Sequence, residues 1–367
     1  MASGAVSSIS FLLPNLGIGG AEKATVKLAN ELFARGYVVR IIVATNRSFA
    51  LEHALVDGVE LIKLRSKALK NSLPRLLFHL TSTRPNFCVA ITRDCCALSA
   101  VLRHITPSTI KWIFSERSSI GSWLKQEKSG IKRWMKRQMF RLVFLSADQI
   151  HCVSNYSKSD MVKNLGIDDA KIYVVYNIVT VDALIPTSCT ELDALKSPFC
   201  LSVGRLVDEK NFEFLISAFA LGSPSNFDLI IIGEGYSRRK LSTLIASLNL
   251  TDRIHLVGSK SNVAPWLINM SAYLSSSLRE GFPNALAEAS GLGKPIIALE
   301  GSGGIREILT NNDNAFIIRD NNIEEYAKTI SSVLKNLGTN PVESLATSDE
   351  RFSAKVVGDD FQRVFLE

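Results

Sequence analysis

The sequence lacks any run of the roughly 18 to 20 apolar residues that a membrane-spanning helix requires, although 46% of its 367 residues are hydrophobic. No basic segment precedes its first apolar residues, Ser10–Leu13, which therefore predict a strand and not a signal peptide. Its six cysteines include no Cys-x-x-Cys pair, a pattern that favours reduced thiols in the cytosol. We expect a cytoplasmic chain that does not span a membrane.

Signatures of metal and dinucleotide binding are missing as well. No Asp-x-Asp triplet occurs, and the five histidines do not fall at ligand spacing, so neither a metal ion nor another cofactor is predicted. The turn Leu16–Glu22 has the spacing Gly-x-Gly-Gly instead of the Gly-x-Gly-x-x-Gly of dinucleotide-binding proteins. This difference argues against a nicotinamide-dependent dehydrogenase.

The length exceeds what one hydrophobic core usually serves, so two domains are expected. Apolar runs alternate with amphipathic segments, stop in the Ser-, Thr- and Pro-rich stretch 186–198, and restart at Phe199. We predict an α/β fold of two doubly wound, Rossmann-like domains facing a cleft, at 1–185 and 199–350, with a linker at 186–198. The strands expected in the first domain are Ile9–Leu13, Val38–Ala44, Val59–Leu64, Phe87–Ile91, Trp112–Ser115, Ile150–Ser154 and Lys171–Tyr176.

Two carboxylates, Glu280 and Glu288, flank a turn that leads from the predicted strand 272–276 into a predicted helix. The first N–H donors of that helix suit a phosphate, Glu288 can accept hydrogen bonds from a ribose diol, and Glu280 can hold hydroxyls of a transferred sugar. An alternative is that Glu280 only complements the helix dipole and Glu288 is a solvated surface residue. The residues of the turn and helix start are Gly281, Phe282, Pro283, Asn284 and Ala285.

These residues resemble glycosyltransferase family 4, whose members are retaining enzymes of GT-B architecture with a Glu-x7-Glu motif in the C-terminal domain. Three further motifs match in the expected order. They are Val203-Gly204-Arg205-Leu206 with Lys210-Asn211, then Gly233-Glu234-Gly235, and then Gly303-Gly304-Ile305-Arg306-Glu307. The resemblance also implies that the last segment, 351–367, is a closing helix that crosses back to the first domain.

The resemblance assigns site residues. Arg205 and Lys210 are expected to hold the donor diphosphate, unless they form a surface salt bridge with Asp208 or Glu209. Gly204, Gly233, Glu234 and Glu307 are expected near the donor.

In the first domain, Gly19 and Gly20 match the family's glycine turn near the donor phosphate; their alternative role is a tight turn alone. Glu116 and Arg117 stand where many members have a histidine beside the reacting sugar, so they are candidate catalytic residues, with an ion pair at a strand end as the alternative.

The basic charge belongs to the first part of the chain, because residues 1–185 carry a balance of +12 and residues 186–367 carry −5. It concentrates in 123–141, which we predict to be one amphipathic helix lying on an anionic bilayer. A solvated basic face with a core-facing apolar stripe is the main alternative, and nucleic-acid binding is disfavoured because no such module accompanies it. The expected membrane or acceptor residues are Trp123, Lys132, Arg133, Trp134, Lys136 and Arg137.

The resemblance implies transfer of a hexose or N-acetylhexosamine, with retained configuration, from a nucleotide-diphosphate sugar, with UDP as the expected nucleotide. With the basic aromatic helix it implies a lipid-linked saccharide acceptor in O-antigen, capsule or exopolysaccharide biosynthesis, at the inner face of the cytoplasmic membrane. Two alternatives stay open: another GT-B enzyme, such as a sugar-nucleotide epimerase or a sucrose- or trehalose-type synthase, and a catalytically silent scaffold protein.

Overall fold

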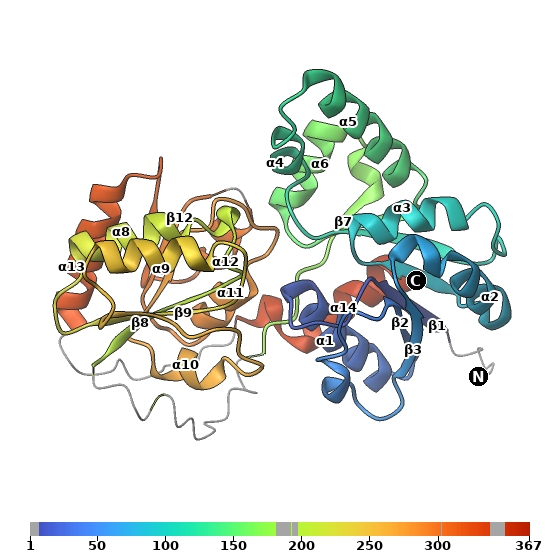
Figure 1. The fold of residues 1–367 in the computed structure, drawn as a ribbon. Helices are drawn as coiled ribbons and strands as arrows, with labels where there is room; N and C mark the ends of the chain where they lie inside the picture. The colour runs from blue at the N-terminus through green and yellow to red at the C-terminus, as the bar shows by residue number, and fades with distance from the viewer. Residues whose placement is uncertain (1–6, 181–191, 193–196, 302, 338–348) are drawn as a thin grey trace. The chain divides into compact units, whose positions relative to one another are not determined.

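The chain divides into two compact units in the structure, which is a computed structural model (Figure 1). It describes residues 7–180, 192, 197–301, 303–337 and 349–367. Unit 1 holds the chain up to Ile178 together with Glu350–Glu367, and unit 2 holds Val179–Asp349. The linker expected at 186–198 lies almost entirely outside the described residues, and so does Cys189.

Unit 1 contains a seven-stranded parallel sheet in the order β3-β2-β1-β4-β5-β6-β7. Near-continuous apolar runs form its central strands, as expected for a sheet covered on both faces. The strands are β1 (Ser8–Leu13), β2 (Val38–Thr45), β3 (Glu60–Ser66), β4 (Phe87–Ala90), β5 (Lys111–Glu116), β6 (Gln149–Cys152) and β7 (Ile172–Val174).

Helices cover both faces of this sheet, and side chains that alternate along β1 supply both cores. Leu12 belongs to the core under α2–α6, whereas Phe11 and Leu13 belong to the core under α1 and the C-terminal segment (Figure 1). The helices are α1 (Gly20–Ala34), α2 (Leu73–Thr83), α3 (Arg93–Leu102), α4 (Ile120–Lys125), α5 (Gly130–Leu145), α6 (Asn155–Leu165) and α14 (Ala354–Phe361).

The C-terminal segment belongs to unit 1, as the fold prediction required. Val357 and Phe361 of α14, and Phe365 of the π-helical turn that follows, are buried in the core beside α1. Arg35 at the end of α1 fixes α14 by donating to Asp359 (2.6 Å) and to the Lys355 carbonyl (2.8 Å). The chain therefore closes unit 1 only after unit 2 has been completed.

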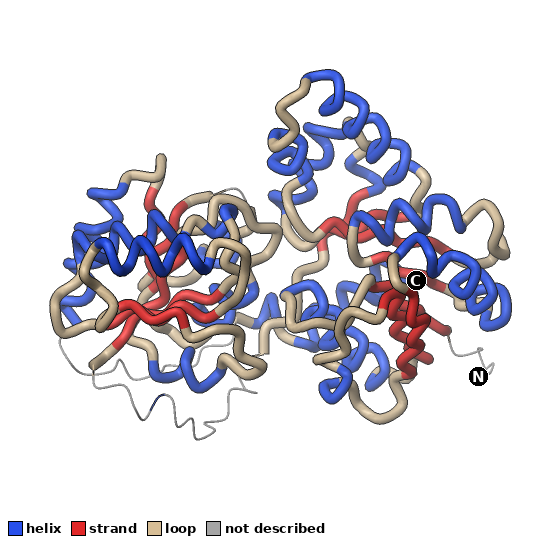
Figure 2. The backbone as a smooth tube through the Cα atoms, in the orientation of Figure 1, coloured by secondary structure: helices blue, strands red, loops and turns tan. Residues whose placement is uncertain are grey.

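Unit 2 contains a six-stranded parallel sheet in the order β10-β9-β8-β11-β12-β13 (Figure 2). Its core faces α8, α9 and α13 on one side, and Phe199 of β8 packs edge-on against Trp266 of α10 on the other. The strands are β8 (Phe199–Val203), β9 (Asp228–Ile232), β10 (Ile254–Leu256), β11 (Ala272–Ser275), β12 (Ile296–Leu299) and β13 (Ala315–Ile318). The helices are α8 (Phe212–Gly222), α9 (Arg238–Ser247), α10 (Ala264–Asn269), α11 (Asn284–Ser290), α12 (Ile305–Leu309) and α13 (Ile323–Leu337).

The seven strands expected in unit 1 and the strand expected at 272–276 in unit 2 are confirmed, with differences of one to two residues at their ends. The single helix predicted for 123–141 was wrong. The chain breaks between α4 and α5, where Ser129 accepts from the Lys132 N–H and caps a new helix. Trp123 is consequently on α4 and the basic residues after 130 are on α5.

Candidate active site

The loops after β8 and β11 come together in unit 2. The chain places β9 and β10 on one side of β8, and then crosses to β11 on the other side. The carboxyl ends of β8 and β11 thus flank the point where the strand order reverses, the usual ligand position in such sheets. The Leu278 N–H donates to the Glu209 carbonyl (2.9 Å) and ties the two loops together.

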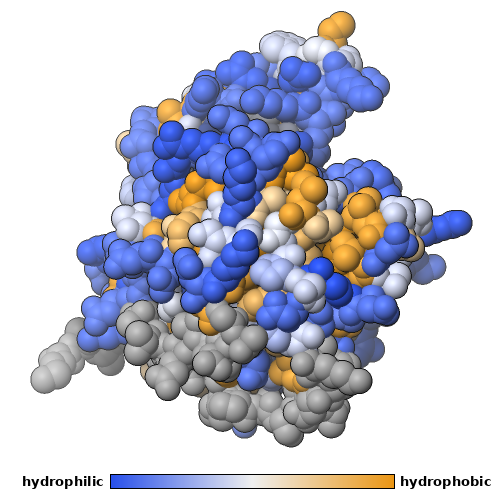
Figure 3. All heavy atoms as spheres, turned by 90° about the vertical axis from the view of Figure 1, so that its left-hand side faces the viewer, coloured by the Kyte–Doolittle hydropathy of each residue, from blue (hydrophilic) through white to orange (hydrophobic). Residues whose placement is uncertain are grey.

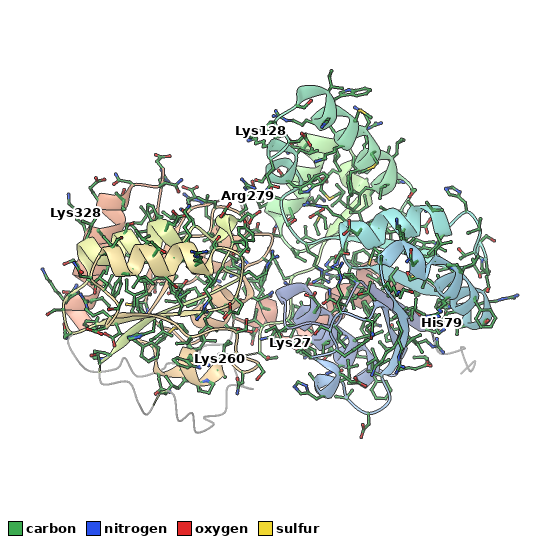
Figure 4. The ribbon with its side chains drawn as sticks, viewed as in Figure 1. Lys27, His79, Lys128, Lys260, Arg279 and Lys328 are labelled. Carbon is green, nitrogen blue, oxygen red and sulfur yellow. The ribbon has the colours of Figure 1, made fainter. Side chains whose placement is uncertain are left out.

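Lys210 and Glu280 form an ion pair across this point, from the loop after β8 to the loop after β11. The Lys210 stem lies against Gly204, where an added Cβ would stand 3.1 Å from the lysine Cε. Asp208, one of the two alternative partners expected for Lys210, accepts a hydrogen bond from the Ser237 hydroxyl (3.2 Å). Glu280 makes this one contact within the described part of the chain, so its other oxygen retains acceptor capacity. Figure 4 labels Arg279, its neighbour in the same loop.

Arg205 follows directly after this strand end and is exposed. Its guanidinium forms no hydrogen bond or ion pair with the described residues, whereas its neighbours Asp208 and Lys210 are both engaged. An unpaired arginine beside Gly204 is available for an anion. Its five N–H donors match phosphate oxygens.

Two glycines let backbone segments approach one another here. Gly233 has φ +151°, and a Cβ on it would stand 1.8 Å from the Gly204 carbonyl oxygen. Gly303 has φ +148°, and a Cβ on it would stand 2.1 Å from the Glu280 carbonyl oxygen. The sequence motifs at 203–206, 233–235, 280–288 and 303–307 are therefore contiguous in unit 2.

Glu288 stands on α11, one helix turn beyond Asn284 and half-buried. Burial, with added repulsion from the charges of Glu280 and Glu288, raises the pKa of Tyr273. Phe282 is 6% exposed and anchors the turn before the helix. Glu234 is exposed and pairs with Arg238 (2.7 Å), and Glu307 is half-buried on α12.

The glycine turn of unit 1 ends at Gly19, the N-cap of α1, so Gly20 is the first helical residue. A Cβ on Gly19 would stand 2.3 Å from the Glu22 carboxylate oxygen, so this side chain folds back over the turn. The turn predicted from the sequence is confirmed, and its role towards a ligand stays a prediction.

Glu116, at the end of β5, is 1% exposed and forms a bidentate ion pair with Arg93, with Nε to Oε2 at 2.7 Å and Nη2 to Oε1 at 2.8 Å. The Ser118 N–H and hydroxyl also donate to Glu116 Oε1. Both carboxylate oxygens thus already accept hydrogen bonds, which leaves little capacity for a substrate. This is the geometry of the alternative role, an ion pair at a strand end. Sequence reasoning missed Arg93.

Arg117 has a different environment. Its Nε donates to Ser115 Oγ (3.1 Å) and its Nη1 to Asn177 Oδ1 (2.8 Å). Burial lowers the pKa of Arg117 to about 10, with Glu22 opposing the shift, so the side chain stays charged at neutral pH. Ser115 in turn contacts His151 Nδ1 (3.0 Å). The sequence analysis did not predict the contact between Ser115 and His151. The sequence feature that could have indicated it is one polar residue inside each of two neighbouring apolar strands.

Trp123 is partly buried and does not belong to an exposed surface. Its ring packs edge-on against Phe140 of α5 (5.0 Å), and the cations of Arg93 and Lys136 each lie 5.2 Å from a ring centroid. A membrane contact of Trp123 therefore stays a prediction. The ring joins α4 to α5.

Several basic residues of α5 hold this helix in place. Arg133 donates to the Glu127 carbonyl, Lys136 pairs with the Glu127 carboxylate (2.7 Å), and Arg137 donates to the Asn164 carbonyl (2.5 Å). Lys132 is exposed. Figure 4 shows Lys128 in the connection between α4 and α5, at the edge of unit 1.

The outer face of α5 carries apolar side chains, although its core face is already formed by Phe140, Val143 and Phe144. Ile131 is 75% exposed, Trp134 59% and Leu142 66%, at a spacing that aligns them along one side of the helix. Met135 and Met139 are also exposed. The face drawn in Figure 3 has hydrophobic patches among hydrophilic residues. Single exposed apolar residues are common on protein surfaces. An aligned stripe is not.

No helix of the described segments combines the length and apolarity needed to cross a membrane. Within the same segments, no three metal-ligating side chains gather into one cluster.

Two protein-family models match the chain and together account for most of it. One is described as Glycosyltransferase Family 4 and matches residues 18–183; the other is described as Glycosyl transferases group 1 and matches residues 191–346. The boundary between the matches falls close to the boundary between the two units.

Curated relatives are similar at low identity. A Campylobacter jejuni protein named N-acetylgalactosamine-N,N'-diacetylbacillosaminyl-diphospho-undecaprenol 4-alpha-N-acetylgalactosaminyltransferase is 27% identical over 54% of this chain and 54% of its own length. The Rhizobium meliloti lipopolysaccharide core biosynthesis glycosyltransferase LpsE is 23% identical over 86% of each chain.

Among solved structures, Anabaena HepE in complex with UDP-glucose superposes with a TM-score of 0.80, covering 98% of this chain and 99% of that chain at 18% identity. This likeness concerns the fold. Together with the two parallel sheets, it confirms the GT-B fold expected from the motifs.

Proposed function

We propose, from the premise that this chain belongs to glycosyltransferase family 4, that it moves a hexose or N-acetylhexosamine from a UDP-sugar to a lipid-linked saccharide. In this proposal the anomeric configuration is retained and no metal ion takes part. The reaction would serve cell-surface polysaccharide biosynthesis. The observation that carries the proposal is the position of Arg205 and the Lys210–Glu280 ion pair at the strand-order reversal of unit 2, with Glu288 on the helix α11 that follows the Glu280 loop. It supports a site for an anion next to a polyol.

The proposed catalytic contribution is electrostatic. A diphosphate leaving group gains negative charge as the glycosidic bond breaks, so fixed cations stabilise the transition state more than the ground state. Arg205 and Lys210 would supply that charge, helped by the N-terminal N–H groups of α11, such as that of Ala285. The free acceptor capacity of Glu280 would hold hydroxyls of the sugar, and Glu288 would hold the ribose.

A thermal-shift titration with UDP, GDP, ADP and CMP in the presence of a chelator tests the donor site. A ligand at a hundred times its dissociation constant adds about 2.7 kcal/mol of stability. We expect stabilisation by UDP in the wild type and none in Glu288→Ala. Glu324→Ala, an exposed glutamate on α13, is the matched control and should respond as wild type. No response of the wild type to any nucleotide would contradict the proposed donor site and favour a silent scaffold.

The acceptor is proposed to be membrane-bound because of the outer face of α5. An apolar stripe containing Trp134, bordered by exposed lysines, has the composition of a helix that lies in the interface of an anionic bilayer. The alternative, a helix with a solvated basic face, requires its apolar residues to face the core. On α5 a second apolar stripe faces solvent as well. We therefore propose peripheral binding at the inner face of the cytoplasmic membrane.

Vesicle sedimentation tests this part separately. The wild type should sediment with phosphatidylglycerol-containing vesicles and stay in solution with neutral phosphatidylcholine vesicles. The double substitution Ile131→Ser and Trp134→Ser should abolish sedimentation, and Lys128→Gln with Lys132→Gln should weaken it. Phe78→Ser is the control, since Phe78 is 74% exposed but lies on α2. Failure of the wild type to bind any vesicle would count against a membrane acceptor and favour a soluble synthase.

A further inference from the structure

Ser115 and His151 are register partners on the adjacent parallel strands β5 and β6, and their side chains are buried. His151 contacts Ser115 Oγ through Nδ1 (3.0 Å) and the Val175 carbonyl oxygen through Nε2 (2.8 Å). Arg117, two residues beyond Ser115, donates its Nε–H to the same hydroxyl (3.1 Å). The three side chains form one continuous chain of hydrogen bonds.

The direction of every bond in this chain is fixed. A carbonyl oxygen can only accept, so His151 must carry its proton on Nε2 and donate to Val175. In the neutral ring Nδ1 is then an acceptor, and the Ser115 hydroxyl must donate to it. The lone pairs of that hydroxyl therefore point at the Arg117 Nε–H. Burial and the positive charge of Arg117 lower the pKa of His151 to about 3, which keeps the ring neutral.

The C-terminal segment seals this arrangement. The rings of Phe361 and Phe365 pack edge-on against the His151 ring, with centroids 5.9 and 5.5 Å away. Gln149, at the start of the same strand, donates to the Val364 carbonyl (2.9 Å). The imidazole is thereby held between the sheet and the last residues of the chain.

Arg117 is consequently held at two nitrogens, by Ser115 at Nε and by Asn177 at Nη1 (2.8 Å). Its Nη2 has no hydrogen-bond partner among the residues that the structure describes, and the residue is not fully buried. A free arginine loses side-chain entropy when it is ordered. An arginine already fixed in place avoids most of this loss when it binds a substrate oxygen.

We infer that His151 is a positioning residue that acts through the Ser115 hydroxyl to aim the Arg117 guanidinium at a phosphate or hydroxyl oxygen of the substrate. The inference rests on the proposed function and on the prediction, implied by the family resemblance, that Arg117 is a catalytic residue, because it takes Arg117 to contact substrate. His151 itself touches no substrate in this scheme.

Nuclear magnetic resonance tests the positioning without any turnover. The Arg117 Nε–H cross-peak, assigned by its loss in Arg117→Met, should be sharp and slow to exchange in the wild type. It should broaden or disappear in Ser115→Ala and in His151→Gln, which keeps a donor for Val175 but removes the acceptor for Ser115. His151→Asn keeps an acceptor near the Nδ1 position and should retain the peak in part. Ser99→Ala is the control, because Ser99 is a buried hydroxyl of unit 1 without a hydrogen-bond partner in the described chain.

Turnover is then measured as UDP release from UDP-glucose or UDP-N-acetylglucosamine. Ser115→Ala should lower kcat about tenfold with little change in KM, and Ser115→Ala should add nothing to Arg117→Met, since both act through one guanidinium. An unchanged Arg117 cross-peak in Ser115→Ala, additive losses in the double variant, or wild-type kcat in Ser115→Ala would each overturn the inference. The UDP thermal shift reports on unit 2, so its absence in the wild type would refute the proposed function instead.

Discussion

Each unit joins a carboxylate and a cation at the carboxyl edge of its sheet, and the two pairs differ in how fully they are satisfied. In unit 1 Glu116 accepts two bonds from Arg93 and two from Ser118. In unit 2 Glu280 contacts Lys210 alone among the described residues, and Arg205 beside it has no partner there. A glutamate paired with a cation at a sheet edge can thus have different roles: a saturated pair holds loops in position, and an unsaturated one can bind a ligand.

Removing Glu116 should give the largest effect on stability. Glu116→Ala leaves the Arg93 guanidinium, which is 16% exposed, without its bidentate partner. Loss of one member of a buried pair costs about 3 kcal/mol or more. Urea unfolding of the purified variant measures the change. Glu116→Gln keeps the shape of the side chain and one accepting oxygen, so it should lose less stability than Glu116→Ala. Wild-type stability of Glu116→Ala would show that the pair is not structural.

Removing Lys210 should give the largest effect on turnover. Lys210→Ala should lower kcat roughly 100-fold or more, the scale seen when a transition-state donor is lost. UDP release from the donor sugar measures the change, and urea unfolding in parallel separates catalysis from stability. Turnover close to that of the wild type would remove Lys210 from the catalytic site and erase the functional contrast with Glu116.

Sequence patterns predicted most of the fold because both sheets are parallel and covered on two faces, which makes their strands apolar throughout. The strand β13 was not predicted, since Ala315–Ile318 is short and only one of its residues is buried. The break between α4 and α5 was missed because Trp123 and the residues of α5 share one amphipathic composition, and the Ser129 cap is a weak local signal.

The residues of the candidate site in unit 2 came from motifs that resemble the family, and the structure brings these motifs together at glycines that allow close backbone approach. Their binding roles stay predictions. The pairing of Lys210 was not predictable, because its partner is 70 residues away and only the strand order brings them together. In unit 1 the contacts of Glu116 and Arg117 depend on strand register, as the Ser115–His151 pair does, and register cannot be derived from composition.

The buried network of unit 1 should also make stability depend on pH. His151 has a folded-state pKa of about 3, lowered by burial and by Arg117, against 6.5 in the unfolded chain. The unfolded state therefore binds the extra proton between these values, and the contribution of His151, complete above pH 6.5, is lost as the pH falls towards 3. The wild type should lose about 1.4 kcal/mol per pH unit more than His151→Gln below pH 6. Urea unfolding at pH 6.5, 5.5 and 4.5 measures both slopes, and parallel slopes would contradict a neutral, buried imidazole.

The smallest effect on turnover and stability is expected for an ion pair that lies at neither sheet edge. Lys240 pairs with Glu213 at 2.6 Å, close to the 2.7 Å of the Arg93–Glu116 pair, but the side chains are 65% and 44% exposed. Solvent screens such a pair, and ordering two long side chains offsets its attraction. Lys240→Ala should therefore change neither turnover nor the free energy of unfolding measurably, in the same two assays used for Lys210→Ala. A loss of turnover comparable to that of Lys210→Ala would mean that removing any lysine of unit 2 impairs the enzyme. The difference between the satisfied and the unsatisfied ion pair would then not explain catalysis.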